Sequence, residues 1–171
     1  RSSVTAYAQQ QAAERQLAQA LGTTSQALLD QASALQNLSL EGDEAIIMQQ
    51  AFLASIGMTE EQIKRIIPVA LDLSAATGMT LESAVRNTAK TFSGLAGELG
   101  ELVPQIRDLS PEAMKAGEAV EVMGELFGGQ ASSAADTFQG KMVRVREIVG
   151  DVLEDIGEKL SPSIESLADA V

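Results

Sequence analysis

The sequence contains no cysteine, no histidine and no tryptophan, and aromatic residues make up only 3% of its 171 residues. Without cysteine and histidine the chain has no disulfide bonds, thiol nucleophiles, imidazole bases or usual zinc ligands. A serine nucleophile would therefore have no histidine to act as its base. We accordingly expect this chain not to be an enzyme, and to use no cofactor and no metal.

Positive charge is also scarce, because 12 lysine and arginine residues face 24 aspartate and glutamate residues, for a formal net charge of -12. The basic residues are scattered rather than clustered. Nucleic-acid binding depends on cations that displace counterions from phosphates, and binding to anionic lipid needs a basic cluster, so we expect neither. No apolar run approaches the roughly 20 residues that cross a bilayer, and no membrane span is predicted.

The residues that are abundant favour helices. Hydrophobic residues make up 45% of the chain, and alanine, leucine, glutamate and glutamine are strong helix formers. No alternating strand pattern is present. The sequence predicts an all-α chain of about seven or eight short-to-medium helices, with a compact central helical core and more extended helical ends. We expect three segments: an Ala/Gln-rich helical segment (1–40), a compact core module (41–128), and a long C-terminal helix with a truncated end (129–171).

Several helix starts are marked by residues whose side chains cap a helix N-terminus. The strongest is Thr59-Glu60-Glu61-Gln62, which has the form of a capping box. Ser110-Pro111 is similar, because proline suits the first helical position, and we expect one helix from there to Phe127. The other expected caps are Thr24 or Ser25, Asp43 and Thr80.

The chain begins with Arg1, and we expect it to be a fragment of a longer protein.

Proline and glycine mark the points where helices should bend or break. Pro68 lies inside the helix that follows Thr59, and a kink is expected because proline cannot bond the Lys64 carbonyl. Gly94, Gly97 and Gly100 fall at intervals of three. They indicate either a loop or broken helix, which we favour, or a smooth helix face that another helix approaches closely.

The phrases TFSG (91–94) and TFQG (137–140) contain two of the four phenylalanines. Their flanking sequences diverge, and two copies are too few for a stacked repeat. We interpret both as packing elements. Phe92 would anchor the end of one helix, with Gly94 letting the chain leave it. Phe138 would anchor the start of another helix, with Gly140 in its first turn.

Pairs of carboxylates three residues apart lie on one face of a helix. They indicate either an acid/base pair or a solvated surface, and we favour the surface because no histidine, cysteine or lysine cluster accompanies them. The pairs are Glu98 with Glu101 and Glu118 with Glu121. We interpret Asp151, Glu154, Asp155 and Glu158 in the same way, as the solvated side of an amphipathic C-terminal helix.

Four phrases, taken together and in order, resemble the tail tape measure proteins of long-tailed bacteriophages and prophages. Each phrase alone is weak, but their order and spacing make the match more specific. The resemblance covers 52–157, and its phrases are MTEEQIKRIIPVALDLSAATG, LSPEAMKAGEAVE, FGGQASSAADTFQGK and IVGDVLEDIGEKL.

The resemblance implies a mostly helical structural protein of the virion tail, whose length sets the length of the tail tube. Its partners would be tail assembly chaperones, the tail tube protein and tail-tip proteins, and self-association is compatible with this role. Such a protein lies in the tube lumen until the genome is ejected, and in the host cytoplasm during assembly. The alternative is a helical binding or adaptor module unrelated to phages.

Overall fold

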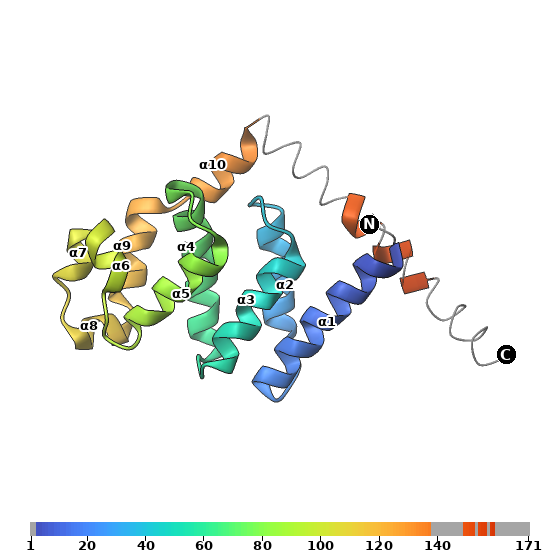
Figure 1. The fold of residues 1–171 in the computed structure, drawn as a ribbon, viewed down its shortest axis with the longest axis horizontal. Helices are drawn as coiled ribbons and strands as arrows, with labels where there is room; N and C mark the ends of the chain where they lie inside the picture. The colour runs from blue at the N-terminus through green and yellow to red at the C-terminus, as the bar shows by residue number, and fades with distance from the viewer. Residues whose placement is uncertain (1–2, 138–148, 153, 157, 160–171) are drawn as a thin grey trace.

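The structure is a computed structural model that describes residues 3–137, 149–152, 154–156 and 158–159. Within these residues it contains ten named helices and no strand, so the predicted all-α class is confirmed, with more helices than expected. Figure 1 shows their order. Their bounds are α1 Ser3–Leu21, α2 Gln26–Gln36, α3 Asp43–Ser55, α4 Glu60–Thr77, α5 Leu81–Thr91, α6 Gly97–Leu102, α7 Pro104–Arg107, α8 Pro111–Ala116, α9 Glu118–Phe127 and α10 Gln130–Asp136.

The helices follow one another along the long axis of the molecule, with α1, α2 and α3 at one end and α6 to α9 at the other (Figure 1). α3 packs against α1 and α2, while α4 lies centrally against α5, α9 and α10. One hydrophobic cluster runs from Ala13 in α1 to Ala131 in α10, with Ile63, Ile66 and Ile67 of α4 fully buried. The N-terminal helix and α10 therefore share their core with 41–128.

Most of the predicted caps are present. Ser25, Thr80 and Ser110 each accept a hydrogen bond from the backbone amide three residues ahead. Thr59 and Gln62 make both bonds of the capping box. Asp43 is the exception, because Gly42 occupies the N-cap of α3 without a side-chain cap and Asp43 is the first helical residue. The Asp43 carboxylate instead accepts a hydrogen bond from Gln10 of α1 (Nε2 to Oδ2, 3.1 Å).

The single helix expected over 110–127 is wrong, because Gly117 divides it into α8 and α9. Gly117 has a φ of +93°, a left-handed conformation that ends α8 and that side chains other than glycine resist. Arg65 of α4 lies over this break, where its Nη2 donates to the Gly117 carbonyl at 3.3 Å. A Cβ on Gly117 would lie 2.7 Å from the Arg65 guanidinium. A side chain at position 117 would therefore have to displace the guanidinium.

A short helix forms at the start of the C-terminal segment 129–171. α10 follows Gly129, which supplies no side-chain cap. Its cap comes from α4, where Asp72 Oδ1 accepts a hydrogen bond from the Ala131 amide at 2.9 Å. A carboxylate at this position also interacts favourably with the helix dipole. The start of α10 therefore depends on a residue that lies far from it in the sequence.

Candidate functional surfaces

Of the predicted anchors, Phe92 and Gly94 stand at the exit of α5. Phe92 is the C-cap of α5 and packs, partly buried, against the hydrophobic core. Gly94 has a φ of +81°, and a Cβ there would lie 3.1 Å from Cβ of Pro111. The chain thus turns away from α5 at Gly94, the glycine that was expected to allow this turn. The other two anchors, Phe138 and Gly140, lie outside the described residues.

The glycine series after α5 forms a break rather than one smooth helix face. Gly94 and Gly97 both have positive φ angles, which confirms the loop or broken-helix interpretation. Gly100 differs, because it is buried inside α6 where α7 approaches closely. A Cβ on Gly100 would lie 3.3 Å from Cβ of Arg107, so this one position matches the close approach that the alternative interpretation described.

Pro68 lies within α4, which continues as one helix to Thr77. Proline leaves the carbonyl four residues earlier, that of Lys64, without its helical donor. Gln31 of α2 supplies the replacement, because its Nε2 donates to the Lys64 carbonyl at 2.8 Å. Gln50 of α3 in turn donates to Gln31 Oε1 at 3.2 Å and to the Leu28 carbonyl at 2.9 Å. The proline therefore anchors a junction of α2, α3 and α4.

The paired glutamates interpreted as surface groups are exposed in all four cases: Glu98, Glu101, Glu118 and Glu121. Glu98 accepts a hydrogen bond from Asn87 (2.7 Å) and Glu121 accepts one from Arg65 (3.3 Å). Their contacts therefore connect neighbouring helices. This arrangement matches the surface interpretation.

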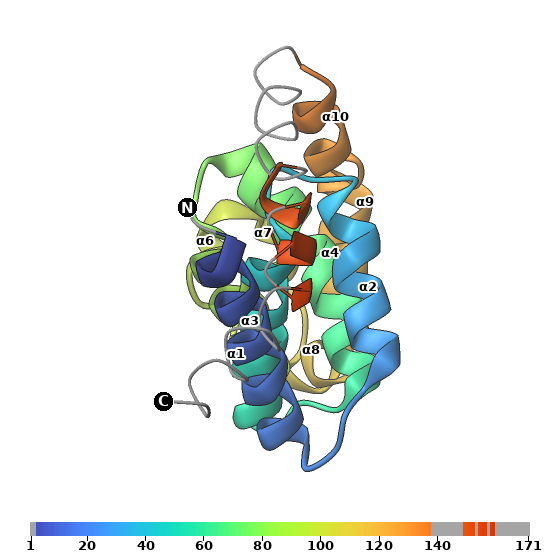
Figure 2. The same cartoon turned by 90° about the vertical axis from the view of Figure 1, so that its right-hand side faces the viewer.

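The C-terminal stretch 149–159 does not keep all of its acidic residues on the solvated side. Its described parts are helical and lie beside α1 (Figure 2). Asp151 and Glu154 are partly buried, and Asp151 accepts a hydrogen bond from Gln36 of α2 at 2.9 Å. Three apolar side chains of the stretch are exposed, namely Val149, Val152 and Ile156. The prediction that all four acidic residues form a solvated face is therefore wrong for Asp151 and Glu154, and holds for Asp155 and Glu158.

Several carboxylates lie near one another where the described residues of 149–159 approach α1 and α3. Burial and the neighbouring negative charges favour the protonated form of these carboxyl groups. Burial, together with the charges of Asp43, Asp151, Glu44 and Glu14, raises the pKa of Glu154 to about 7. Burial and the charges of Asp151 and Glu44 raise the pKa of Asp43 to about 6. Burial also raises the pKa of Asp151, which the Gln36 hydrogen bond opposes. Desolvation and like charges both disfavour an ionised carboxylate, and sequence reasoning missed this grouping.

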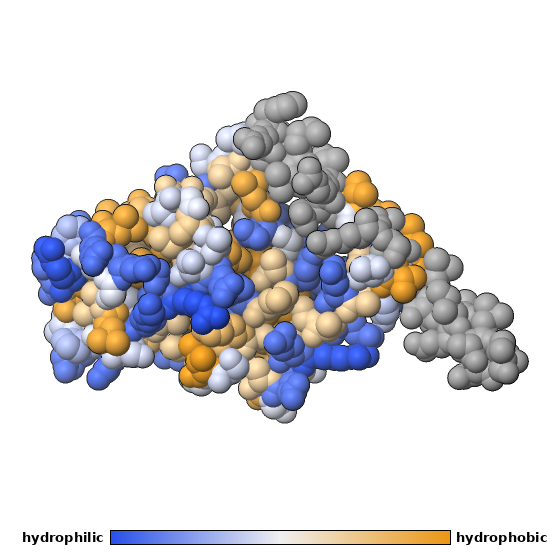
Figure 3. Space-filling model, viewed as in Figure 1, coloured by the Kyte–Doolittle hydropathy of each residue, from blue (hydrophilic) through white to orange (hydrophobic). Residues whose placement is uncertain are grey.

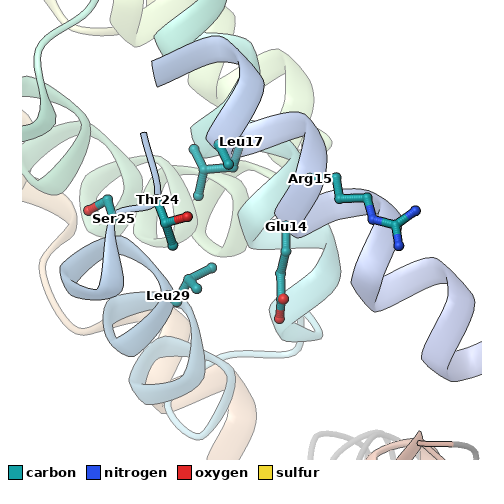
Figure 4. Close-up of a pocket in the computed structure, with 7 residues that line it drawn as sticks. Glu14, Arg15, Leu17, Thr24, Ser25 and Leu29 are labelled. Atoms are coloured by element: carbon teal, nitrogen blue, oxygen red, sulfur yellow. The ribbon is translucent and has the colours of Figure 1, made fainter. Parts of the chain in front are cut away.

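Several hollows in the surface of the described residues have room for a small group. One of about 180 Å³ lies between α1 and α2, where Leu17, Thr24 and Leu29 converge and Arg15 points away (Figure 4). The Ser25 hydroxyl at its edge is already engaged, because it donates to Glu60 at 2.7 Å. A larger hollow of about 520 Å³ lies between α3 and α5. There the Arg86 guanidinium stands 4.3 Å from the centre of the Phe52 ring.

In the part of the chain that the structure describes, no group of three or more carboxylates is arranged to hold a metal ion. Among the same residues, no helix combines the length and the hydropathy needed to cross a membrane. Comparisons with protein-family models, curated proteins and solved structures find no match for this chain.

Proposed function

We propose that this chain is a structural component of a phage tail, a helical module of a tape measure protein. The proposal depends on the ordered phrases of the sequence, which resemble that family over 52–157. In this role the parent protein sets the length of the tail tube during assembly. It would lie in the tube lumen until the genome is ejected.

The position of the phrases in the fold supports treating them as one unit. The first, 58–78, includes α4 and its capping box; the second, 109–121, includes α8 and the start of α9; the third, 127–141, includes α10. Both α9 and α10 pack on α4. Phrases separated by tens of residues thus meet in one packed structure, as expected of segments that belong to a single module.

Exposed aliphatic side chains occur on several elements of the described residues. On the face of the molecule that Figure 3 shows, apolar residues lie in separate places among polar residues. Singly scattered apolar side chains are normal on a protein surface, so the partners follow from the resemblance rather than from these residues. Tail assembly chaperones, tube subunits and tail-tip proteins are the partners that we propose. Examples of these side chains are Leu38, Ile56, Leu95, Leu102 and Leu126.

The experiment is an in-frame deletion of residues 41–140 from the parent protein in the phage or prophage that encodes it. In the tube we propose that the module extends as continuous helix, which rises about 1.5 Å per residue, so the loss of 100 residues shortens the tape by about 150 Å. We expect tails shorter by that amount in electron micrographs. A matched control replaces 41–140 with an unrelated helical sequence of equal length, and its tails should keep the original length. Shortened protein with tails of unchanged length would contradict the proposal.

The second candidate is a helical binding or adaptor module unrelated to phages. The parent reading frame separates the two candidates. A tape measure protein is a very long, helix-rich chain encoded beside tube and tail-tip genes, whereas an adaptor would have a short parent in another setting. Co-purification of the chain with the neighbouring assembly chaperone would favour the tape measure function.

A further inference from the structure

The hollow of about 520 Å³ between α3 and α5, called the α3–α5 hollow below, brings three apolar side chains together at the surface. Ile56 is 50% exposed, yet it does not stand alone, because Phe52 and Met58 line the same hollow. Both are only partly buried where they pack against the core. A ring, a branched side chain and a flexible thioether form an apolar floor that adapts to the shape of a partner side chain.

The same hollow carries positive charge, which is scarce in this chain. Arg86 and Lys90 lie one turn apart on α5 and both line it, and Glu98 is the one acidic residue among the described residues that do so. Side chains four positions apart share a face of a helix. Two cations therefore lie beside one carboxylate at this place, in a chain whose net charge is -12.

The Arg86 guanidinium is positioned by an aromatic ring and keeps donors for a further acceptor. It stands 4.3 Å from the centre of the Phe52 ring, a distance at which cation and ring attract each other. Arg86 also pairs with Glu82 at 3.0 Å, but the two side chains are 52% and 60% exposed. Such an exposed pair contributes little. A guanidinium has five N–H donors, so a second carboxylate finds donors there.

The Lys90 ammonium is positioned by a buried amide. Asn87 is only 5% exposed, and its Oδ1 accepts a hydrogen bond from Lys90 Nζ at 3.4 Å. The Asn87 Nδ2 donates to Glu98 at 2.7 Å, so one amide orients both charged groups. No carboxylate of the described residues forms an ion pair with Lys90. An ammonium has three donors, and Lys90 therefore suits an acceptor that comes from outside the chain.

The exposure of the lining favours a segment of a protein over a small molecule. Pockets for small ligands enclose most of the ligand surface. In the α3–α5 hollow, Ile56 is half exposed, and Arg86 and Lys90 are exposed as well, so a small molecule would stay largely in water. An amphipathic helix instead places several side chains along a groove between two helices and covers its floor.

We propose that the α3–α5 hollow is a docking site for an acidic amphipathic helix of another protein. A leucine-like side chain of that helix packs on Phe52, Ile56 and Met58. A glutamate or aspartate one turn away accepts hydrogen bonds from Arg86 and Lys90, which are strong because both partners are charged. This docking site does not depend on the tape measure proposal.

The test uses a fluorescein-labelled peptide of about 16 residues, long enough to form helix, with leucines along one face and glutamates one turn from them. A matched peptide has glutamine in place of every glutamate. Fluorescence anisotropy measures the binding of each peptide to the 171-residue chain. We expect the acidic peptide to bind at least about tenfold more tightly, because only its carboxylates make charge-assisted hydrogen bonds. Amide shifts in NMR spectra should change in α5 and at Ile56 and stay constant in α1.

Variants of the chain separate the charged from the apolar part of the site. Arg86→Gln with Lys90→Gln should lower the affinity for the acidic peptide at least about tenfold and abolish its advantage over the glutamine peptide. The control pair Arg107→Gln with Lys115→Gln removes two exposed cations elsewhere and should preserve that advantage. Ile56→Ser should weaken both peptides alike. Circular dichroism confirms that each variant is folded.

The docking site is overturned if the acidic peptide has a Kd above about 1 mM, or if both peptides bind equally well to the unmodified chain. It is also overturned if the control pair abolishes the preference as fully as the Arg86 and Lys90 pair. Hexanoate that binds the hollow as tightly as the peptide would assign it to small carboxylates instead. Dimers in light scattering that the peptide cannot dissociate would assign it to a second copy of the chain.

Discussion

Glutamine side chains make connections between helices that aromatic residues and ion pairs supply in other proteins. Gln31, Gln36 and Gln10 each reach across a helix boundary to a backbone carbonyl or a carboxylate. An uncharged amide carries both a donor and an acceptor, so it can satisfy a partly buried partner without adding charge. At the scale of single residues, this chemistry suits a chain that has few aromatic rings and an excess of acids.

The bond from Gln31 to the Lys64 carbonyl should be coupled to Pro68. Gln31→Leu leaves that carbonyl without a donor and should lower the free energy of unfolding by about 1–2 kcal/mol. In a Pro68→Ala background the new backbone amide of residue 68 bonds the carbonyl instead, so Gln31→Leu should cost less. Urea denaturation of both single variants and of the double variant measures the difference, which we expect to be at least about 0.5 kcal/mol. Additive effects would show that the amide does not replace the helical bond.

At the scale of elements, helix ends are decided in two different ways. Ser25, Thr59, Thr80 and Ser110 cap their own helices through bonds to a residue three positions ahead. The start of α10 is instead capped by Asp72 of α4. A helix that depends on such a contact forms only when the rest of the structure is in place, because a short isolated helix is marginal in water.

The break between α8 and α9 provides a matched pair of glycine substitutions. Gly117→Ala must adopt a left-handed conformation and displace the Arg65 guanidinium, so it should destabilise the fold by about 1–3 kcal/mol. Gly124→Ala lies inside α9, where a Cβ would meet only Val69 Cγ2 at 3.9 Å. It should stabilise the fold by up to about 1 kcal/mol through helix propensity. Opposite shifts in the urea midpoint are expected, and a neutral Gly117→Ala would show that α8 and α9 can straighten.

At the scale of the whole molecule, excess negative charge opposes the compact state. The net charge is -12, and several carboxylates are partly buried near one another. Glu41 is partly buried as well, and burial raises its pKa. A carboxyl whose pKa is raised on folding stabilises the folded state at low pH and loses that contribution as the pH rises. The molecule should therefore be more stable in mild acid than above neutrality.

Calorimetry should show this dependence as a higher Tm at pH 5.5 than at pH 8. We expect a difference of a few degrees, since 1 kcal/mol corresponds to about 2–4 °C for a protein of this size. Asp43, with a pKa raised to about 6, titrates inside this window, so Asp43→Asn should raise the Tm at pH 8 and reduce the difference. The exposed control Glu125→Gln should leave the difference nearly unchanged. A higher Tm at pH 8 than at pH 5.5 would contradict this account.

The sequence by itself determined the all-α class, the main helix starts and the exit of the chain from α5. These features depend on helix propensity, on capping bonds between residues three apart, and on glycine where φ is positive, all of which are local. Only the tertiary structure decided how the Lys64 carbonyl is satisfied, what caps α10 and which way the stretch 149–159 faces. Their hydrogen bonds join residues 33, 59 and 115 positions apart. No local pattern encodes such pairs, because they form only when packing brings distant helices together.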